Sequence, residues 1–236
     1  MKNIANSVKA ALLNYIYESP STRDPRLLFH KVRQKGFSYI YANKYSHDFY
    51  AEHIPWKPAY KNLAKIIYEW AEPSTACDIG CGTGYLIYFL SRLGVEVFGY
   101  DQSPEILDFI DPTLKDRVSI LDLSVPQSLL KCDLCVCVEV AEHVPKRFSN
   151  ALINNITSCA RSHVFFTAAR PGQWGDGHIN CRKQEYWIDL FSEKRWGYQS
   201  EATNCLIEGV KEDAKISKSL PWLAENIMLF KPVSPK

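Results

Sequence analysis

The chain has 236 residues, of which 46% are hydrophobic and 23% charged, and its formal net charge is +2. This composition is typical of a globular protein with a well-developed core, and it excludes a disordered chain. Because no block of Lys and Arg and no apolar run of about 20 residues occurs, we expect neither a nucleic-acid partner nor a membrane span.

Strand and helix patterns alternate along most of the chain. Residues 1–60 are expected to form a helical cap, and residues 61–236 a main domain. The elements predicted by periodicity and by Gly and Pro signals are a helix at 61–71, a strand at 75–80, a helix at 85–94, a strand at 95–101, a helix at 103–110 with Ser103 as its N-cap, strands at 117–121 and 133–140, a helix at 147–160, a strand at 163–169, a helix at 182–197 and a strand at 226–231. This order predicts an α/β fold with a doubly wound, mostly parallel sheet.

Eight cysteines occur without a convincing signal peptide, so we expect reduced thiols and a cytoplasmic location. Cys132 and Cys135 form a CxxC pattern inside the alternating apolar stretch "CDLCVCVEV". No second pair at zinc-finger spacing accompanies them. Buried structural thiols are therefore favoured over a zinc or redox site.

A glycine-rich turn, "CDIGCGTGY", follows the first predicted strand. Glycines let the backbone turn sharply and approach a ligand closely. Ligands of open α/β sheets bind beyond the carboxyl ends of the strands, where this turn lies. The spacing is GxGxG, which differs from the GxGxxG of dinucleotide-binding folds and lacks the Lys-Ser/Thr of a phosphate loop.

Four segments in order resemble the motifs of class I S-adenosylmethionine-dependent methyltransferases: "DIGCGTG", "GYD", "SILDLSVP" and "CVEVAEHV". The resemblance covers about residues 62–231. It implies a seven-stranded, Rossmann-like sheet whose last pair, near 198–203 and 226–231, includes an antiparallel strand. It also implies the cofactor S-adenosylmethionine, held by Asp78, Gly80, Cys81, Gly82, Gly84, Asp101, Gln102, Asp122, Leu123 and Glu139. In the family, the residue matching Asp101 accepts from the ribose hydroxyls and the one matching Asp122 from the adenine amino group.

The loop "PGQWGDGHIN" follows the strand at 163–169, so we expect it at the acceptor side of the site. It resembles a subset of these methyltransferases with a "GHxN" stretch. A base near a hydroxyl acceptor accelerates transfer by roughly 10²–10⁴-fold. His178 is the first candidate for that base and His143 the second, because imidazole changes protonation near neutral pH.

Other side chains of this region are candidates for acceptor contact. Asp176 could orient an imidazole, Asn180 could hold a polar acceptor, and Trp174 could form a pocket wall. Tyr50 could reach the site from the N-terminal segment. A metal site from His143, Asp176 and His178 is conceivable but disfavoured, and we expect no metal.

The sequence therefore predicts an S-adenosylmethionine-dependent methyltransferase acting on a small-molecule, sugar or metabolite acceptor by in-line displacement. A hydroxyl acceptor is preferred because "EVAEHV" stands where amino-group methyltransferases of DNA, RNA and protein carry an Asn/Asp-Pro-Pro-aromatic pattern. The alternatives are a nicotinamide-dependent oxidoreductase and a non-catalytic S-adenosylmethionine-binding regulatory protein. The acceptor's identity and the oligomeric state stay open.

Overall fold

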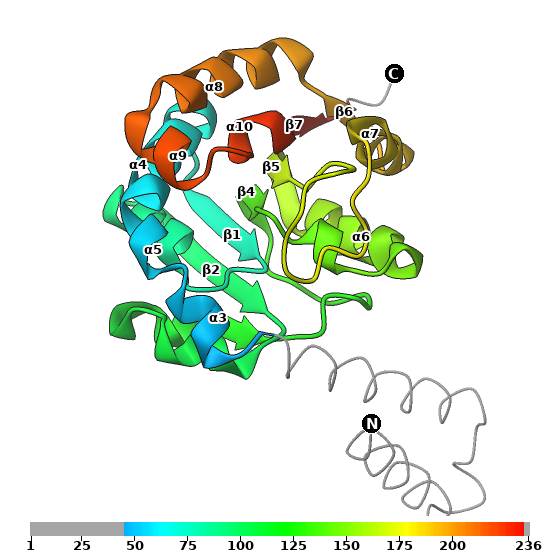
Figure 1. Ribbon diagram of the computed structural model, residues 1–236. Coiled ribbons are helices and arrows are strands. Elements are labelled where there is room, and N and C mark those ends of the chain that lie inside the picture. The colour runs from blue at the N-terminus through cyan, green and yellow to red at the C-terminus, as the bar shows by residue number, and fades with distance from the viewer. Residues whose placement is uncertain (1–44, 234–236) are drawn as a thin grey trace, which may run out of the picture. The chain divides into compact units, whose positions relative to one another are not determined.

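The structure, a computed structural model, describes residues 45–233 (Figure 1). The chain divides into two units, Met1–Phe49 and Tyr50–Lys236. Of the predicted helical cap, residues 1–44 lie outside the described residues. The second unit begins at Tyr50, earlier than the predicted boundary at residue 61, because the helix that starts at Lys57 packs on the main sheet's helical layer.

A seven-stranded sheet forms the centre of this unit, in the order β3-β2-β1-β4-β5-β7-β6. Only β7 runs antiparallel to its neighbours, pairing with both β5 and β6. The strands are β1 Thr75–Ile79, β2 Glu96–Asp101, β3 Val118–Ile120, β4 Cys132–Cys137, β5 Ala160–Thr167, β6 Trp196–Tyr198 and β7 Ile227–Pro232. The predicted fold class, a doubly wound and mostly parallel sheet, is confirmed.

Helices cover both faces of the sheet. In Figure 1, α4 and α5 lie on one side of the strands and α6 and α7 on the other. The α-helices are α3 His47–Ala51, α4 Lys57–Ala71, α5 Tyr85–Arg92, α6 Ser149–Cys159, α7 Gln184–Glu193, α8 Ser200–Glu212, α9 Ala214–Ser219 and α10 Leu223–Asn226. The 3₁₀ turns are η2 Ile54–Trp56, η3 Pro104–Asp108, η4 Pro112–Arg117, η5 Ala141–His143 and η6 Lys146–Phe148.

Amphipathic spacing explains how these helices attach. The α4 helix buries Ala59, Leu63, Ala64 and Ile67, which recur at three- and four-residue steps along one stripe. It ends where Glu72 adopts a left-handed conformation with φ of 41°. On the opposite layer, Trp187 and Phe191 of α7 are fully buried against Phe166 of β5.

Three local predictions were wrong. Residues 104–108 form a 3₁₀ turn in place of an α-helix, and the Ser103 side chain makes no capping hydrogen bond. Pro112 then starts the next 3₁₀ turn, η4. The helix predicted at 182–197 ends at Glu193, and Trp196–Tyr198 form strand β6. The strand expected near 198–203 ends at Tyr198, and Ser200 begins α8. Among the described residues, no helix has both the length and the apolarity that crossing a membrane requires.

Candidate active site

The glycine turn connects β1 to α5 at the carboxyl edge of the sheet. Gly80, Gly82 and Gly84 have φ values of +80°, +49° and +68°. The N–H groups of Gly80 and Cys81 both donate to the Tyr100 carbonyl, at 2.7 and 3.1 Å. A Cβ atom at Gly80 would overlap the side chain of Val140. Glycine is therefore required here by backbone conformation and by close packing together.

Two buried carboxyl groups lie beside this turn. Asp101 ends β2 and accepts from the Gly82 N–H with Oδ2 and from the Ser103 N–H with Oδ1, both at 2.9 Å. Burial raises the pKa of Asp101, although the backbone N–H groups, that of Gln102 included, favour its charged form. Burial and the nearby Asp101 together raise the pKa of Asp78 to about 8. This acidic pair suits a ligand that brings hydroxyl donors or positive charge.

The segment after β3 is held by its own hydrogen bonds. Oδ1 of Asp122 accepts from the N–H and hydroxyl of Ser124, at 2.9 and 2.6 Å. Leu123 is buried, and its carbonyl accepts from the Asn155 amide at 3.1 Å. These contacts fix the path of the chain beside β2. They also mean that the Leu123 carbonyl already accepts a hydrogen bond from within the protein.

Glu139 connects the end of β4 to the acceptor loop. Its backbone has a φ of +54°, and its N–H donates to Thr167 Oγ1 at 2.9 Å. Its carboxylate accepts from Asn226 Nδ2 at 3.0 and 3.1 Å and from Gln173 Nε2 at 3.3 Å. The carboxylate of Glu139 is thus held between β5, α10 and the loop that carries His178.

Tyr60 of α4 also faces this edge, although no sequence pattern predicted it there. The pKa of its phenol is raised, first by burial and then by the nearby carboxyl groups of Asp78 and Glu139. Tyr50 lies over the glycine turn, since its ring would be 3.7 Å from a Cβ atom placed on Gly82. Tyr50 also packs on Phe109, which follows η3, with ring centroids 5.8 Å apart.

An acidic and imidazole cluster forms where the acceptor loop meets the end of β4. Glu142, His143 and His178 place one ligand atom each within 4.8 Å of one another. The rings of His143 and His178 meet edge to face, with centroids 5.0 Å apart. The main-chain carbonyl of Glu142 accepts from the N–H groups of Ile179 and Asn180, at 3.0 and 2.9 Å, and so fastens the loop beside the cluster.

The Glu142 side chain is fully buried. Among the described residues, neither of its carboxylate oxygens has a hydrogen-bond partner, although the N–H groups of Glu142 itself and Ala169 lie near enough to favour its charged form. Burial, followed by repulsion from Glu139, raises the pKa of Glu142 well above its usual range. A buried carboxyl without partners is costly, so this position is suited to a proton, a cation or a polar ligand.

The tautomer of His178 follows from its contacts. Nδ1 lies 3.1 Å from the Gln173 carbonyl, which can only accept, so Nδ1 carries the proton. Nε2 then faces Glu142 Oε1 at 4.0 Å. In the neutral ring, this nitrogen presents a lone pair toward the cluster.

The other loop residues predicted to contact the acceptor are dispersed. Trp174 is 97% exposed, and Asp176 is also exposed, so Asp176 stays outside the histidine cluster. Asn180 is buried, with its Nδ2 donating to Ala141 O and Ser149 Oγ at 3.3 and 3.0 Å. Its Oδ1 accepts from Arg182 Nε at 2.8 Å. The Asn180 amide thus anchors the loop, and the acid that joins the histidines is Glu142.

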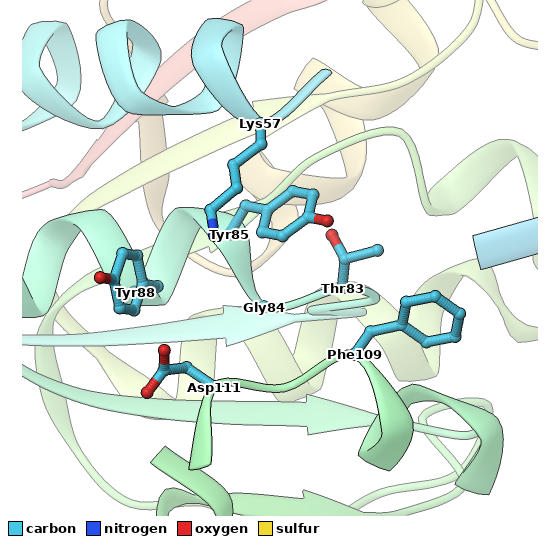
Figure 2. Close-up of a pocket in the computed structure, with 7 residues that line it drawn as sticks. All are labelled: Lys57, Thr83, Gly84, Tyr85, Tyr88, Phe109 and Asp111. Atoms are coloured by element: carbon cyan, nitrogen blue, oxygen red, sulfur yellow. The ribbon is translucent and has the colours of Figure 1, made fainter. Parts of the chain in front are cut away.

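A small cavity lies on the α5 side of the glycine turn (Figure 2). It has a volume of about 50 Å³ and includes Thr83, Gly84, Phe109 and Asp111. Lys57 extends across its wall, with Nζ 5.4 and 5.3 Å from the ring centroids of Tyr85 and Tyr88. Ligand sites generally enclose about 300 Å³ or more, so this cavity alone cannot hold a nucleoside.

The curated relatives of this chain include two ubiquinone biosynthesis O-methyltransferases. The mitochondrial ubiquinone biosynthesis O-methyltransferase of Schizosaccharomyces pombe is 36% identical over 89 residues, which cover 34% of this chain and 32% of that protein. The ubiquinone biosynthesis O-methyltransferase of Burkholderia orbicola is 28% identical over 135 residues, covering 54% of this chain and 50% of that one. The chain thus matches half or less of the length of these relatives.

Solved structures share the fold at low sequence identity. CalS10, an amino pentose methyltransferase from Micromonospora echinaspora solved with bound S-adenosylmethionine, matches with a TM-score of 0.57 and 11% identity over 75% of this chain and 92% of that one. The magnesium protoporphyrin IX methyltransferase of Synechocystis, solved with S-adenosylhomocysteine, matches with a TM-score of 0.54 and 15% identity over 76% and 84%.

A family model described as "Methyltransferase domain" matches residues 50–207, more than half of the chain. The matched range contains the glycine turn, the buried acids and the histidine cluster. The likeness to the "GHxN" subset stays a prediction. The chain belongs to the methyltransferase domain family, and its sheet is the Rossmann-like fold of class I S-adenosylmethionine-dependent methyltransferases.

Proposed function

We propose that the protein transfers a methyl group from S-adenosylmethionine to a hydroxyl group of a small molecule. The observation that carries this proposal is the cluster of Glu142, His143 and His178 at the same carboxyl edge as the glycine turn and Asp101. A cofactor site and a proton-accepting group beside it are the two parts that O-methyl transfer requires.

The cofactor site fits the residues present. The bare backbone at Gly82 allows a ligand to approach closely, and Asp101 retains free lone pairs for vicinal hydroxyls. The adenine base of the cofactor would be flanked by Gln102, Asp122 and Leu123. The carboxyl groups of Asp78 and Glu139 would attract the positive charge of the sulfonium. When bound, S-adenosylmethionine supplies an electrophilic methyl group on a sulfonium.

His178 is the proposed general base. Its Nε2 lone pair faces the cluster, and its Nδ1–H is held by the Gln173 carbonyl, so the ring is oriented to accept a proton. Glu142 Oε1 lies 4.0 Å from Nε2, and the His143 ring lies against the His178 ring. Such a base contributes roughly 10²–10⁴-fold, while alignment of acceptor and methyl contributes up to about 7–11 kcal/mol.

A divalent cation at the same cluster is a second candidate for acceptor activation. The unpartnered oxygens of Glu142, facing two imidazoles, favour it. One carboxylate and two histidines suit Zn²⁺, Mn²⁺ or Fe²⁺. A cation there would lower the pKa of a bound hydroxyl and replace the base.

Methyl transfer to catechol and other phenols tests the proposal, because the two curated relatives are named as O-methyltransferases. We expect transfer that falls at least a hundredfold in His178→Ala. Loss of transfer in EDTA, with recovery on adding Mn²⁺ or Zn²⁺, would assign the cluster to a cation. Unchanged transfer in EDTA would leave His178 as the base.

Calorimetry with S-adenosylmethionine, S-adenosylhomocysteine and NAD⁺ separates the alternatives. Binding of both sulfur ligands without transfer to any acceptor of the panel would favour a non-catalytic binding protein. Binding of NAD⁺ alone would contradict the proposal and support an oxidoreductase.

A further inference from the structure

A group of cysteine side chains lies in the core, away from the proposed methyl-transfer site. Cys77 of β1, Cys135 of β4 and Cys159 at the end of α6 are fully buried. Cys77 and Cys135 are register partners on neighbouring parallel strands. Cys159 reaches the same pair from the helix that covers this face of the sheet, so three separate elements bring their sulfurs together.

The separations are those of ligand atoms around one ion. Sγ of Cys77 lies 3.3 Å from Sγ of Cys159, and all three sulfurs are within 4.8 Å of one another. Zn–S bonds of about 2.3 Å in a tetrahedral site place sulfurs about 3.8 Å apart. The 3.3 Å separation is shorter than that value and the 4.8 Å upper limit is longer, so sulfur shifts of at most about 1 Å would complete a three-sulfur site.

A fourth cysteine is available nearby. Cys132, at the start of β4, is fully buried and close enough to Cys77 for their thiols to interact. Residues three apart on a regular strand face opposite sides of the sheet. Here the pairing register of β4 with β5 shifts between Cys132 and Leu134. Cys132 therefore lies in the same core cluster as Cys135. The CxxC pattern thus contributes both of its sulfurs to one side of the sheet.

We propose that Cys77, Cys135 and Cys159, with Cys132 as a fourth ligand, form a structural site for a thiophilic metal ion of the Zn²⁺ class. Each coordinating thiol releases its proton to solvent as the metal–sulfur bond forms, and no sulfur is oxidised. A bound ion would clamp β1, β4 and α6 together behind the glycine turn. The proposal is independent of the methyl-transfer reaction, because none of these sulfurs belongs to the proposed cofactor or acceptor site.

Burial predicts how the ion enters. All four cysteines have no exposed surface, so the ion has to bind while the core forms and cannot be added readily to the folded protein. The experiment is to unfold the full chain in guanidinium with a reductant and refold it with or without Cd²⁺. Thiolate-to-Cd²⁺ charge-transfer absorption reports sulfur ligation specifically, and the Glu142 cluster cannot produce it.

We expect refolding with Cd²⁺ to give the absorption band, a single tightly held ion per chain and a raised Tm. Cys159→Ala and Cys135→Ala should lose the band, whereas Cys205→Ala, which removes an exposed cysteine, should keep it. Cooperative thermal unfolding in the absence of metal shows that each variant folds. If Cys159→Ala does not fold, Cys159→Val is used in its place.

Two results of the refolding experiment would overturn the proposal. One is a wild-type chain that refolds with Cd²⁺ present and shows no charge-transfer band. The other is a band that persists in folded Cys159→Ala and Cys135→Ala. If mass spectrometry of the protein purified without reductant shows a Cys77–Cys159 disulfide and no metal, the cluster is a redox pair and the proposal fails as well.

Discussion

Acidic side chains with raised pKa values gather at one edge of the sheet. Asp78 lies near the end of β1, Asp101 ends β2, and Glu139 and Glu142 follow β4. Burial is the largest cause of the raised pKa in every one of these residues. Such a concentration of buried carboxyl groups destabilises a fold, which is typical of a site arranged for a ligand. The proposed chemistry of the protein uses these four groups and the two histidines.

Asp101→Asn is expected to weaken S-adenosylhomocysteine binding at least tenfold, measured by calorimetry. An amide keeps one acceptor oxygen but turns an NH₂ group toward the Gly82 N–H or the ribose hydroxyls. Asp108→Asn, at an exposed position on the same segment, is the matched control. Equal affinity in the two variants would contradict the role of Asp101.

Stability without ligand should depend on pH through Asp78. Its pKa in the folded protein is about 8, above the unfolded value of about 4, so the folded state binds the proton more tightly. The stabilisation is complete below pH of about 4 and is lost as pH rises through about 8. We expect the urea midpoint to fall between pH 6 and 9, and to fall less in Asp78→Asn.

Trp174→Ala should leave the Tm unchanged, because the ring is 97% exposed and buries almost no surface. If Trp174 contacts the acceptor as predicted, KM for the acceptor rises while the affinity for S-adenosylhomocysteine stays constant. Unchanged KM and kcat together would remove Trp174 from the acceptor site.

At the scale of elements, the loops at the carboxyl edge are held by many specific contacts. The turn after β1 is tied to β2 through Tyr100 and Asp101, and the loop after β5 is tied to η5 through Glu142 and Asn180. Glu139 connects the end of β4 to that same loop through Gln173. The site is thus assembled by loops whose positions are fixed by neighbouring strands.

Gly80→Ala tests the turn after β1. Its φ of +80° and the overlap with Val140 both oppose a Cβ atom, so we expect a loss of stability of about 1–3 kcal/mol and impaired cofactor binding. Gly172→Ala is the matched control, because Gly172 has a φ of +90° and no atom within 4 Å of its Cβ position. A similar effect on cofactor binding in both variants would contradict the importance of packing at Gly80.

The whole unit is held together by the core between the sheet and α7. Phe191 and Phe230 stack with ring centroids 3.9 Å apart, and Phe230 lies on the antiparallel strand β7. Phe230→Ala should cost about 3–5 kcal/mol in denaturant unfolding. Val233→Ala, at a half-exposed position just past β7, should cost far less. An equally small loss in both variants would show that β7 is not part of the cooperative core.

The sequence alone was sufficient for the alternation of strands and helices, the glycine turn and the family, because each depends on local periodicity or on residues close together in the chain. His143 and His178 were also predicted to lie near the acceptor, and the fold brings their rings together beside Glu142. Glu142 escaped notice because a single glutamate in "AEHV" carries no local sign of burial. The short turn after β2 and the boundary between β6 and α8 depend on packing that neighbouring residues do not specify.

Tertiary structure decided which side chains meet. Asp176 and Asn180 looked equivalent in the loop sequence, yet the first is exposed and the second is buried as an anchor. Cys77, Cys135 and Cys159 are far apart in the chain and converge because parallel strands and a covering helix share one face. Periodicity reports which face of its own element a residue occupies, but the partner on that face is set by sheet order and loop path, which only the folded chain determines.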